Sequence, residues 1–183
     1  YRQLLRVTKS SLEGLEINIF SDVEDTSNIA GYDQAIQDGV SAWYINKDGK
    51  RQINIRMGTN QKINSAVLVH ELMHAATADA LAIMRKDPSK YPKAQQAYSN
   101  LEALYQHVKT QVQDGDSQLV KYGVSNLDEF IATGLTYPQF MQFLDNIKSV
   151  PKAKGRGLSN FKPGSMLRAV VDNLLTVMRD VFG

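Results

Sequence analysis

The stretch His70-Glu-Leu-Met-His74 constrains this chain more than any other feature, because it lies inside a long apolar segment. Residues 65 to 84 are apolar almost all round the helical wheel, two basic residues follow, and Pro88 ends the pattern. The sequence therefore predicts a buried helix. Positions i and i+4 share one face of a helix, so the two imidazoles can bind one metal ion.

Glu71 lies roughly 100° around this helix from His70, where its carboxylate can reach a water molecule bound to the same metal. A catalytic zinc site uses three protein ligands and keeps one position for water, whose proton becomes easier to remove. The chain has no cysteine, so His, Asp and Glu are its strong metal ligands. The alternative is a set of polar side chains without a metal, which would leave buried polar groups without partners.

The third ligand has to come from elsewhere in the chain. A metzincin continuation would place Gly and His three and six residues after His74, where this chain has Thr77 and Ala80. A thermolysin-like Glu about twenty residues after the second His is also absent, because position 94 is Ala. These two spacings therefore exclude both patterns.

Three residues remain as candidates for the third ligand. His107 and Glu102 lie off the apolar stripe of a helix predicted between residues 94 and 112, so we expect both to face solvent. Glu129 lies on the first turn of a helix predicted from residue 126 to residue 133, and we favour it as the ligand. The alternative is a capping box, in which Asn126 caps the helix and Glu129 is the third helical residue.

At these residues the chain resembles the gluzincin metallopeptidases, in particular the anthrax lethal factor-like branch. Glu129-Phe-Ile-Ala132, 55 residues after His74, is similar to the Glu-Phe-x-Ala element of that branch. The resemblance covers roughly residues 40 to 140. It implies a zinc-dependent endopeptidase with a zincin-like fold, with Zn²⁺ bound by His70, His74 and Glu129, Glu71 as general base, and a protein or peptide as substrate.

The same resemblance gives Tyr122 a role. In the lethal factor-like branch, a Tyr seven residues before the Glu donates a hydrogen bond to the developing oxyanion, and Tyr122 has this spacing. The alternative is an aromatic side chain that only packs before a turn. Similar modules occur inside large proteins of phages and mobile elements, and the chain opens at Tyr1 without Met, so we expect a part of a longer polypeptide.

Alternating apolar and polar residues predict strands at residues 3 to 7 and 15 to 20. Residues 41 to 57 predict a β-hairpin, because Asp48-Gly49 provides the positive φ that a tight turn needs. Strands followed by helices predict an α+β domain, with a small mixed sheet whose edge hairpin packs on the metal-binding helix, and a helical C-terminal half. The later helices are expected at residues 94–112, 126–133, 138–147 and 165–181.

The resemblance also implies a substrate-binding strand. In zincins the strand before the metal-binding helix lies at the lip of the cleft, and an extended peptide pairs with it. This implication assigns substrate binding to Gln52, Ile53, Asn54, Ile55 and Arg56. The alternative is an ordinary edge strand protected from aggregation by Arg51 and Arg56.

The rest of the chain argues against other classes of function. A net charge of +2 gives no general attraction to nucleic acid or to an anionic membrane, and the longest apolar run is too short for a membrane span. No signal peptide is visible, so we expect a soluble protein. Residues 149–163 look like a solvated basic linker, the loop at 114–116 like a solvated turn, and residues 1–148 like one domain on which the C-terminal helix packs.

A rival from another class remains open at this point. The zincin fold could be kept as a non-catalytic docking module of a virion or DNA-delivery protein. Glu71 argues against this alternative, because a purely structural zinc needs no base.

Overall fold

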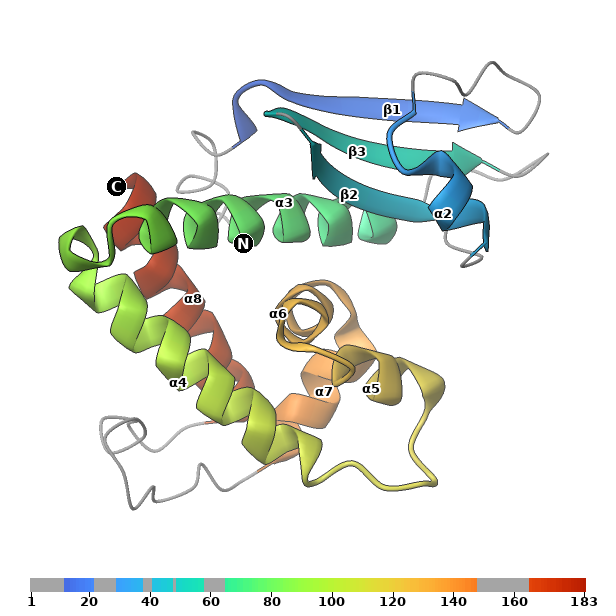
Figure 1. Cartoon of the computed structure of the whole chain (residues 1–183). Helices are drawn as coiled ribbons and strands as arrows, with labels where there is room; N and C mark the ends of the chain where they lie inside the picture. Colours follow the sequence, from blue (N-terminus) through green and yellow to red (C-terminus); the bar gives the residue numbers. More distant parts are fainter. Residues whose placement is uncertain (1–11, 22–28, 38–40, 48, 58–64, 148–164) are drawn as a thin grey trace.

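The computed structural model describes residues 12–21, 29–37, 41–47, 49–57, 65–147 and 165–183 (Figure 1). The strand predicted at residues 3 to 7 and the predicted linker at 149–163 lie outside these ranges. The described elements are β1 (Leu15–Ser21), α2 (Tyr32–Gln37), β2 (Ala42–Lys47), β3 (Lys50–Met57), α3 (Ser65–Lys86), η2 (Pro88–Lys90), α4 (Pro92–Lys109), α5 (Gln118–Gly123), α6 (Leu127–Thr136), α7 (Pro138–Asn146) and α8 (Met166–Phe182).

The described strands form one three-stranded mixed sheet in the order β1-β3-β2. β2 and β3 are the predicted hairpin, and Gly49 in its turn has φ +79°, a backbone conformation that glycine adopts at little steric cost. β1 pairs parallel to β3, with Ile17 opposite Ile53. The expected mixed sheet is confirmed, but β3 is its central strand rather than an edge.

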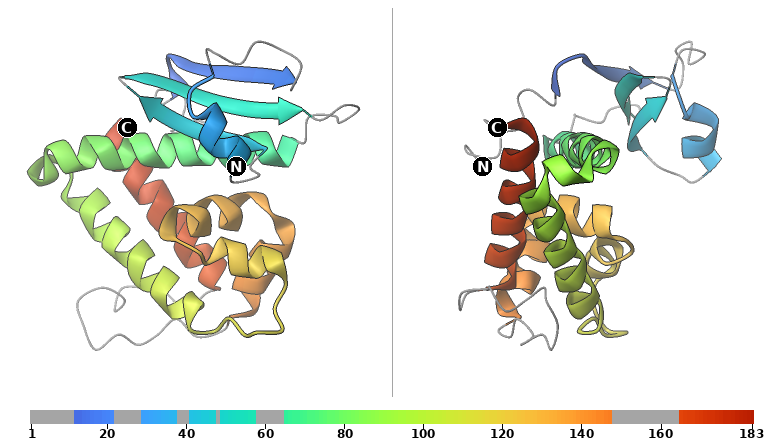
Figure 2. Two further views of the ribbon diagram at one scale, coloured as in Figure 1. Left: turned by 45° about the vertical axis from the view of Figure 1, so that its right-hand side comes forward. Right: turned by 60° about the vertical axis from the view of Figure 1, so that its left-hand side comes forward.

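Helix α3 lies between the sheet and the other long helices (Figures 1 and 2). On the sheet side, a small buried apolar cluster joins the two layers, and its members are Ala42, Ile53, Ile55 and Ala75. The opposite face of the sheet is covered by α2, where Phe20 lies against the rings of Tyr32 and Trp43. Because both sides of α3 are covered, this helix is apolar around most of its circumference.

The helical C-terminal half is confirmed and contains the larger core. α4 and α8 lie side by side, and α6 and α7 pack beside them (Figures 1 and 2). The largest fully buried side chains of this core include Leu101, Leu104, Phe130, Phe140, Leu144, Met166, Leu174 and Met178. The C-terminal helix thus packs on the same body as the residues around the predicted metal site.

Two helix predictions need correction. The helix predicted to end at residue 133 continues through Gly134 to Thr136 as α6. A Cβ on Gly134 would lie 3.2 Å from a methyl of Leu144, so this glycine allows close packing between helices instead of ending one. The short helices α2 and α5 were not expected, and α5 begins at a Ser117 cap whose side chain accepts from the Val120 N–H.

Contrary to the expectation that the longest apolar run is too short for a membrane span, α3 is long and apolar enough by length and composition, alone among the described helices. More than half of that apolar stretch is buried inside the fold, as in the core helix of a soluble protein. The burial is therefore compatible with the expected soluble protein.

Candidate metal centre

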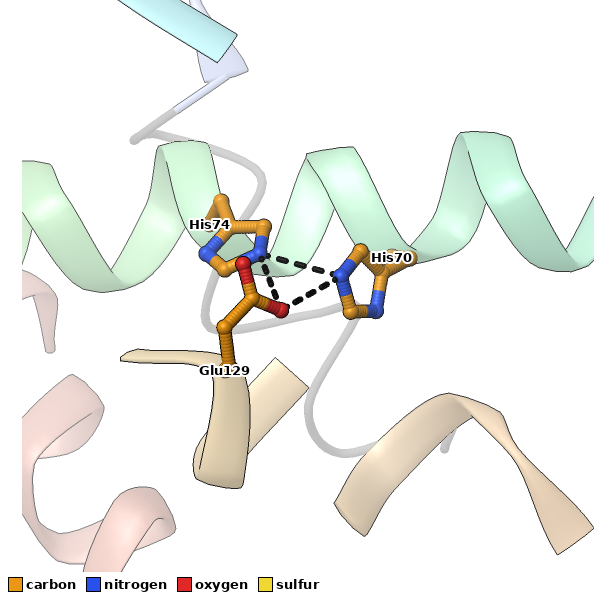
Figure 3. Close-up of side chains that lie close together, drawn as sticks. All are labelled: His70, His74 and Glu129. Carbon is orange, nitrogen blue, oxygen red and sulfur yellow. Dashed lines mark hydrogen bonds and ion pairs between the residues drawn. The ribbon is translucent and has the colours of Figure 1, made fainter. Parts of the chain in front are cut away.

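Three side chains from two helices converge beside α3 (Figure 3). His70 Nε2 lies 3.0 Å from His74 Nε2 and 3.1 Å from Glu129 Oε2, and His74 Nε2 lies 3.4 Å from the same oxygen. One potential ligand atom from each residue lies within 4.8 Å of the others. The three residues favoured from the sequence therefore form a group that could hold a metal ion.

Glu129 reaches this group from the start of α6. The Asn126 side chain caps the helix by accepting a 2.8 Å hydrogen bond from the Glu129 N–H. This part of the capping-box alternative is correct, but the Glu129 carboxylate itself contacts the two histidines. Ala132, one turn later, is fully buried where α6 packs near α3. Its small side chain suits a close approach between the two helices.

The hydrogen bonds around His70 show that the group fits a cation. The Thr136 hydroxyl donates to the Ala132 carbonyl at 2.7 Å, so it accepts from His70 Nδ1, which lies 3.3 Å away. Because Nδ1 of His70 then carries the proton, Nε2 has a lone pair, and this lone pair faces the Glu129 carboxylate. Two acceptors at this distance repel each other unless a proton or a metal ion lies between them.

The pKa values of Glu129 and His74 are shifted from their ordinary values. Burial alone would raise the pKa of Glu129, but its contacts with the rings of His70 and His74 and its hydrogen bond with the Tyr122 hydroxyl hold it well below its ordinary value. Burial disfavours charged His74, yet its contact with Glu129 and the nearby charge of Glu71 raise its pKa overall. Glu129 is therefore an anion over a wide pH range, as a metal ligand should be.

Glu71 is buried beside the group without belonging to it. Its carboxylate accepts a hydrogen bond from the backbone of Tyr44 on β2. Burial raises the pKa of Glu71 and the Glu129 charge adds to this effect, while the two histidines and the Tyr44 hydrogen bond oppose it. A carboxylate with a raised pKa next to a metal group suits a general base.

Tyr122 lies at the same group, near the end of α5. Its hydroxyl is hydrogen-bonded to Glu129, and its ring centroid lies 6.1 Å from that of His70. Burial and the charges of Glu129 and Glu71 raise its pKa, so the hydroxyl keeps its proton. The neighbouring Gly123 lets α5 approach α7, because a Cβ there would lie 2.7 Å from the Phe140 ring.

Thr136 and Tyr137 also lie next to the group, although neither is predicted from the sequence as a site residue. The Tyr137 ring packs edge-on to His70 with centroids 5.5 Å apart, and the nearby Glu71 and Glu129 charges raise its pKa beyond the effect of burial. Their positions at the end of a short helix carry no motif. The one sequence signal is the spacing of seven residues, about two helical turns, which indicates that Glu129 and Thr136 share a face of their helix.

The sheet corrects the assignment of substrate binding to β3. Both edges of β3 are paired within the sheet, so an added peptide strand has no free main-chain groups there. The side chains point into structural contacts: Ile53 and Ile55 into the apolar cluster on α3, Gln52 to Glu16, and Asn54 to Asn18. Arg56 is partly buried, and its backbone N–H donates to the Ser41 carbonyl.

A polar contact connects the sheet to α3, the helix that bears His70 and His74. The buried Asp79 on α3 forms a salt bridge with Arg51 of β3 and accepts a 3.3 Å hydrogen bond from the Tyr44 hydroxyl of β2. Tyr44 therefore contacts α3 twice, through its hydroxyl and through the backbone hydrogen bond to Glu71.

The other candidates lie away from the group. Glu102 is exposed on α4, as expected. His107 is partly buried rather than exposed, and it also lies outside the group. In the loop at 114–116, the Asp116 carboxylate accepts from the Gln113 backbone at 2.7 Å, which is the turn expected there.

Comparisons with protein-family models, with curated proteins and with solved structures find no match for this chain.

Proposed function

We propose that this chain is a zinc-dependent endopeptidase domain. The single observation that supports this function best is the convergence of His70, His74 and Glu129 beside the buried, unliganded carboxylate of Glu71. Structural zinc sites use four protein ligands and need no base, whereas three ligands and a neighbouring carboxylate are typical of hydrolytic sites. The resemblance to gluzincins favours the same function.

The residues divide the reaction between them. Zinc held by His70, His74 and Glu129 would lower the pKa of a bound water to about 7. Glu71 takes a proton from the water as the water oxygen bonds to the peptide carbonyl carbon. Glu71 then delivers that proton to the amide nitrogen as the carbon–nitrogen bond breaks. The raised pKa of Glu71 suits a group that must hold the proton between these steps.

Tyr122 is proposed to stabilise the oxyanion. Its hydroxyl keeps its proton and lies beside Glu129, and the side chain is 46% exposed, so a substrate can reach it. In the reaction the hydroxyl turns from Glu129 to the carbonyl oxygen, where negative charge develops.

The substrate is proposed to pair with β2 rather than β3. The Arg56 N–H donates to Ser41, so alternation along an antiparallel pair points the main-chain groups of Ala42, Tyr44 and Asn46 outward. No strand of the described residues pairs with this edge, and the Tyr44 hydrogen bond to Glu71 places it beside the base. An extended peptide added there passes next to the metal group.

N-methylation of single amides in a cleaved peptide tests the β2 proposal. The cleavage rate should fall when the N-methyl group is on every second amide of the peptide and stay unchanged for the amides between, because only alternate amides of an added strand face β2. Equal tolerance at all positions would exclude strand addition.

The test of the proposed function combines metal content with turnover. Protein purified with zinc should contain about one zinc per chain. Against a peptide library, Glu71→Gln should keep the zinc and lose on the order of 100- to 10,000-fold in rate, because the amide cannot accept the proton. Glu102→Gln, on the exposed face of α4, is the matched control and should cleave like wild type.

Two results would reject the proposed function. Equal cleavage by wild type and Glu71→Gln would remove Glu71 from the mechanism. Zinc-loaded wild type that cuts no peptide in the library would favour the non-catalytic docking module instead.

A further inference from the structure

The two histidines of the metal centre are supported differently. His70 is 4% exposed, and its Nδ1, on the side away from Glu129, lies 3.3 Å from the hydroxyl of Thr136. Thr136 is itself buried, at 8% exposed. Among the described residues, no side-chain partner of this kind is seen for His74 Nδ1. The position of His70 therefore depends on a group that the motif does not contain.

The direction of this hydrogen bond follows from the second contact of Thr136. Its hydroxyl has one hydrogen, and the Ala132 carbonyl, 2.7 Å away, can only accept. The hydroxyl therefore offers a lone pair to His70, whose Nδ1 must be the protonated nitrogen. The other nitrogen, Nε2, is left with its lone pair directed at His74 and Glu129.

Helix α6 supplies both groups from one face. Glu129 and Thr136 are seven residues apart, about two turns, with Ala132 between them on the same side. This face thus provides the third ligand at one end and the partner of the first ligand at the other. A one-residue rotation of α6 would lose both contacts.

We propose that Thr136 is a positioning residue that fixes the Nδ1-protonated tautomer and the ring orientation of His70 for zinc. This inference rests on the zinc site proposed above. Loss of such a partner of a metal-bound histidine typically weakens metal binding by about 10- to 100-fold.

Competition of the whole chain with a zinc chelator measures the effect. Thr136→Val keeps the size and the branched Cβ but removes the hydroxyl, and zinc affinity should fall by about 10- to 100-fold. Thr136→Ser restores the hydroxyl and should recover most of the affinity. Thr133→Val is the matched control, since Thr133 is fully buried on the same helix and its hydroxyl has no hydrogen-bond partner.

Nitrogen NMR of the histidine rings gives a readout that a purely structural role would not move. In zinc-loaded wild type, His70 should carry its proton on Nδ1, and this N–H should show the signal of a hydrogen bond to the Thr136 hydroxyl. In Thr136→Val the Nδ1–H signal should move to that of an N–H without this hydrogen bond. This measurement on wild type tests the proposal even if Thr136→Val does not fold.

The outcomes separate this inference from the proposed function. If wild type binds no zinc, the proposed function fails. If wild type binds zinc and Thr136→Val binds it equally well, or if His70 carries its proton on Nε2, the role of Thr136 is wrong and the zinc site stands. Equal losses in Thr136→Val and Thr133→Val would also overturn it, because they would reflect the packing of α6 alone.

Discussion

The helical body and the sheet layer contribute different parts of the candidate site. His70, His74 and Glu129 all belong to α3 and α6, and Tyr122 comes from α5. The sheet places no side chain in the metal group, but its β2 backbone contacts Glu71. The difference indicates that the helical body provides the group that could hold a metal ion, while the sheet layer sets the surroundings of Glu71, the proposed base.

The two regions also differ in what holds them together. The helical body has an extensive buried core that includes the fully buried rings of Phe130 and Phe140. The sheet joins α3 through the small cluster around Ile53 and Ile55 and through the Asp79 contacts with Arg51 and Tyr44. Changes in the two regions should therefore separate zinc binding from turnover.

The largest expected effect belongs to the helical body. Glu129→Ala removes the proposed third ligand, so zinc affinity should fall by more than about 100-fold, which exceeds the loss expected for an outer hydrogen-bond partner of a ligand. Zinc titration with His107→Ala and Glu102→Ala as controls checks this, because both controls lie outside the group. Full zinc affinity with a less stable α6 would show that Glu129 acts only in the helix cap.

Tyr122→Phe sharpens the comparison within the helical body. In the proposed reaction this change removes one donor to the oxyanion and no ligand, so turnover should fall on the order of 100-fold with nearly unchanged zinc affinity. Single-turnover kinetics with a cleaved peptide measures the effect. A variant with normal turnover would assign Tyr122 to packing.

Asp79→Asn tests the link between the two regions. Hydrogen bonds to charged groups contribute about 1.5–3 kcal/mol, so the free energy of unfolding should fall by this amount. Turnover should also fall, because the weakened contact between Asp79 and the Tyr44 hydroxyl no longer holds β2 and its hydrogen bond to Glu71 in place. Zinc affinity should stay close to that of wild type.

The control for Asp79→Asn is Asp172→Asn. It breaks an exposed salt bridge with Arg168 on α8 and should cost about 0.5 kcal/mol or less. Loss of zinc in Asp79→Asn would contradict the division between the regions.

The smallest effect concerns alkaline pH. Burial, with the charge and hydrogen bond of Asp79, raises the pKa of Tyr44 from 10.0 to about 12. Between these values the unfolded chain loses the phenol proton and the folded chain keeps it, so stability falls as pH rises through this window. The free energy of unfolding of chelator-treated protein, measured with urea across this pH range, should fall less steeply with pH for Tyr44→Phe than for wild type. Parallel curves would mean that Tyr44 is not held at Asp79.

Much of the site could be predicted because it depends on local patterns. The helix with its His-Glu-x-x-His motif and the hairpin at Gly49 each follow from residues close in sequence. The approach of Glu129 is non-local, and its selection came from its place on a short capped helix and from a resemblance to known motifs.

The remaining features depend on tertiary packing. The parallel pairing of β1 with β3 joins segments more than 30 residues apart, and no pattern within 51–57 shows which strand will be central. Thr136 looks like an ordinary helix-end residue until α6 is packed on α3. Gly134 has the sequence of a helix end, but the contact with Leu144 gives it a place inside α6.

The position of α3 in the chain has a consequence for biosynthesis. The side of α3 that faces away from the sheet is covered by helices that follow it, and the last of them, α8, ends at Phe182, 96 residues after Lys86. At about 5 to 20 residues per second, α3 leaves the ribosome about 5 to 20 s before its last partner. During this interval the apolar surface that α8 later buries is exposed and prone to aggregation, and a product truncated before α8 would keep it exposed.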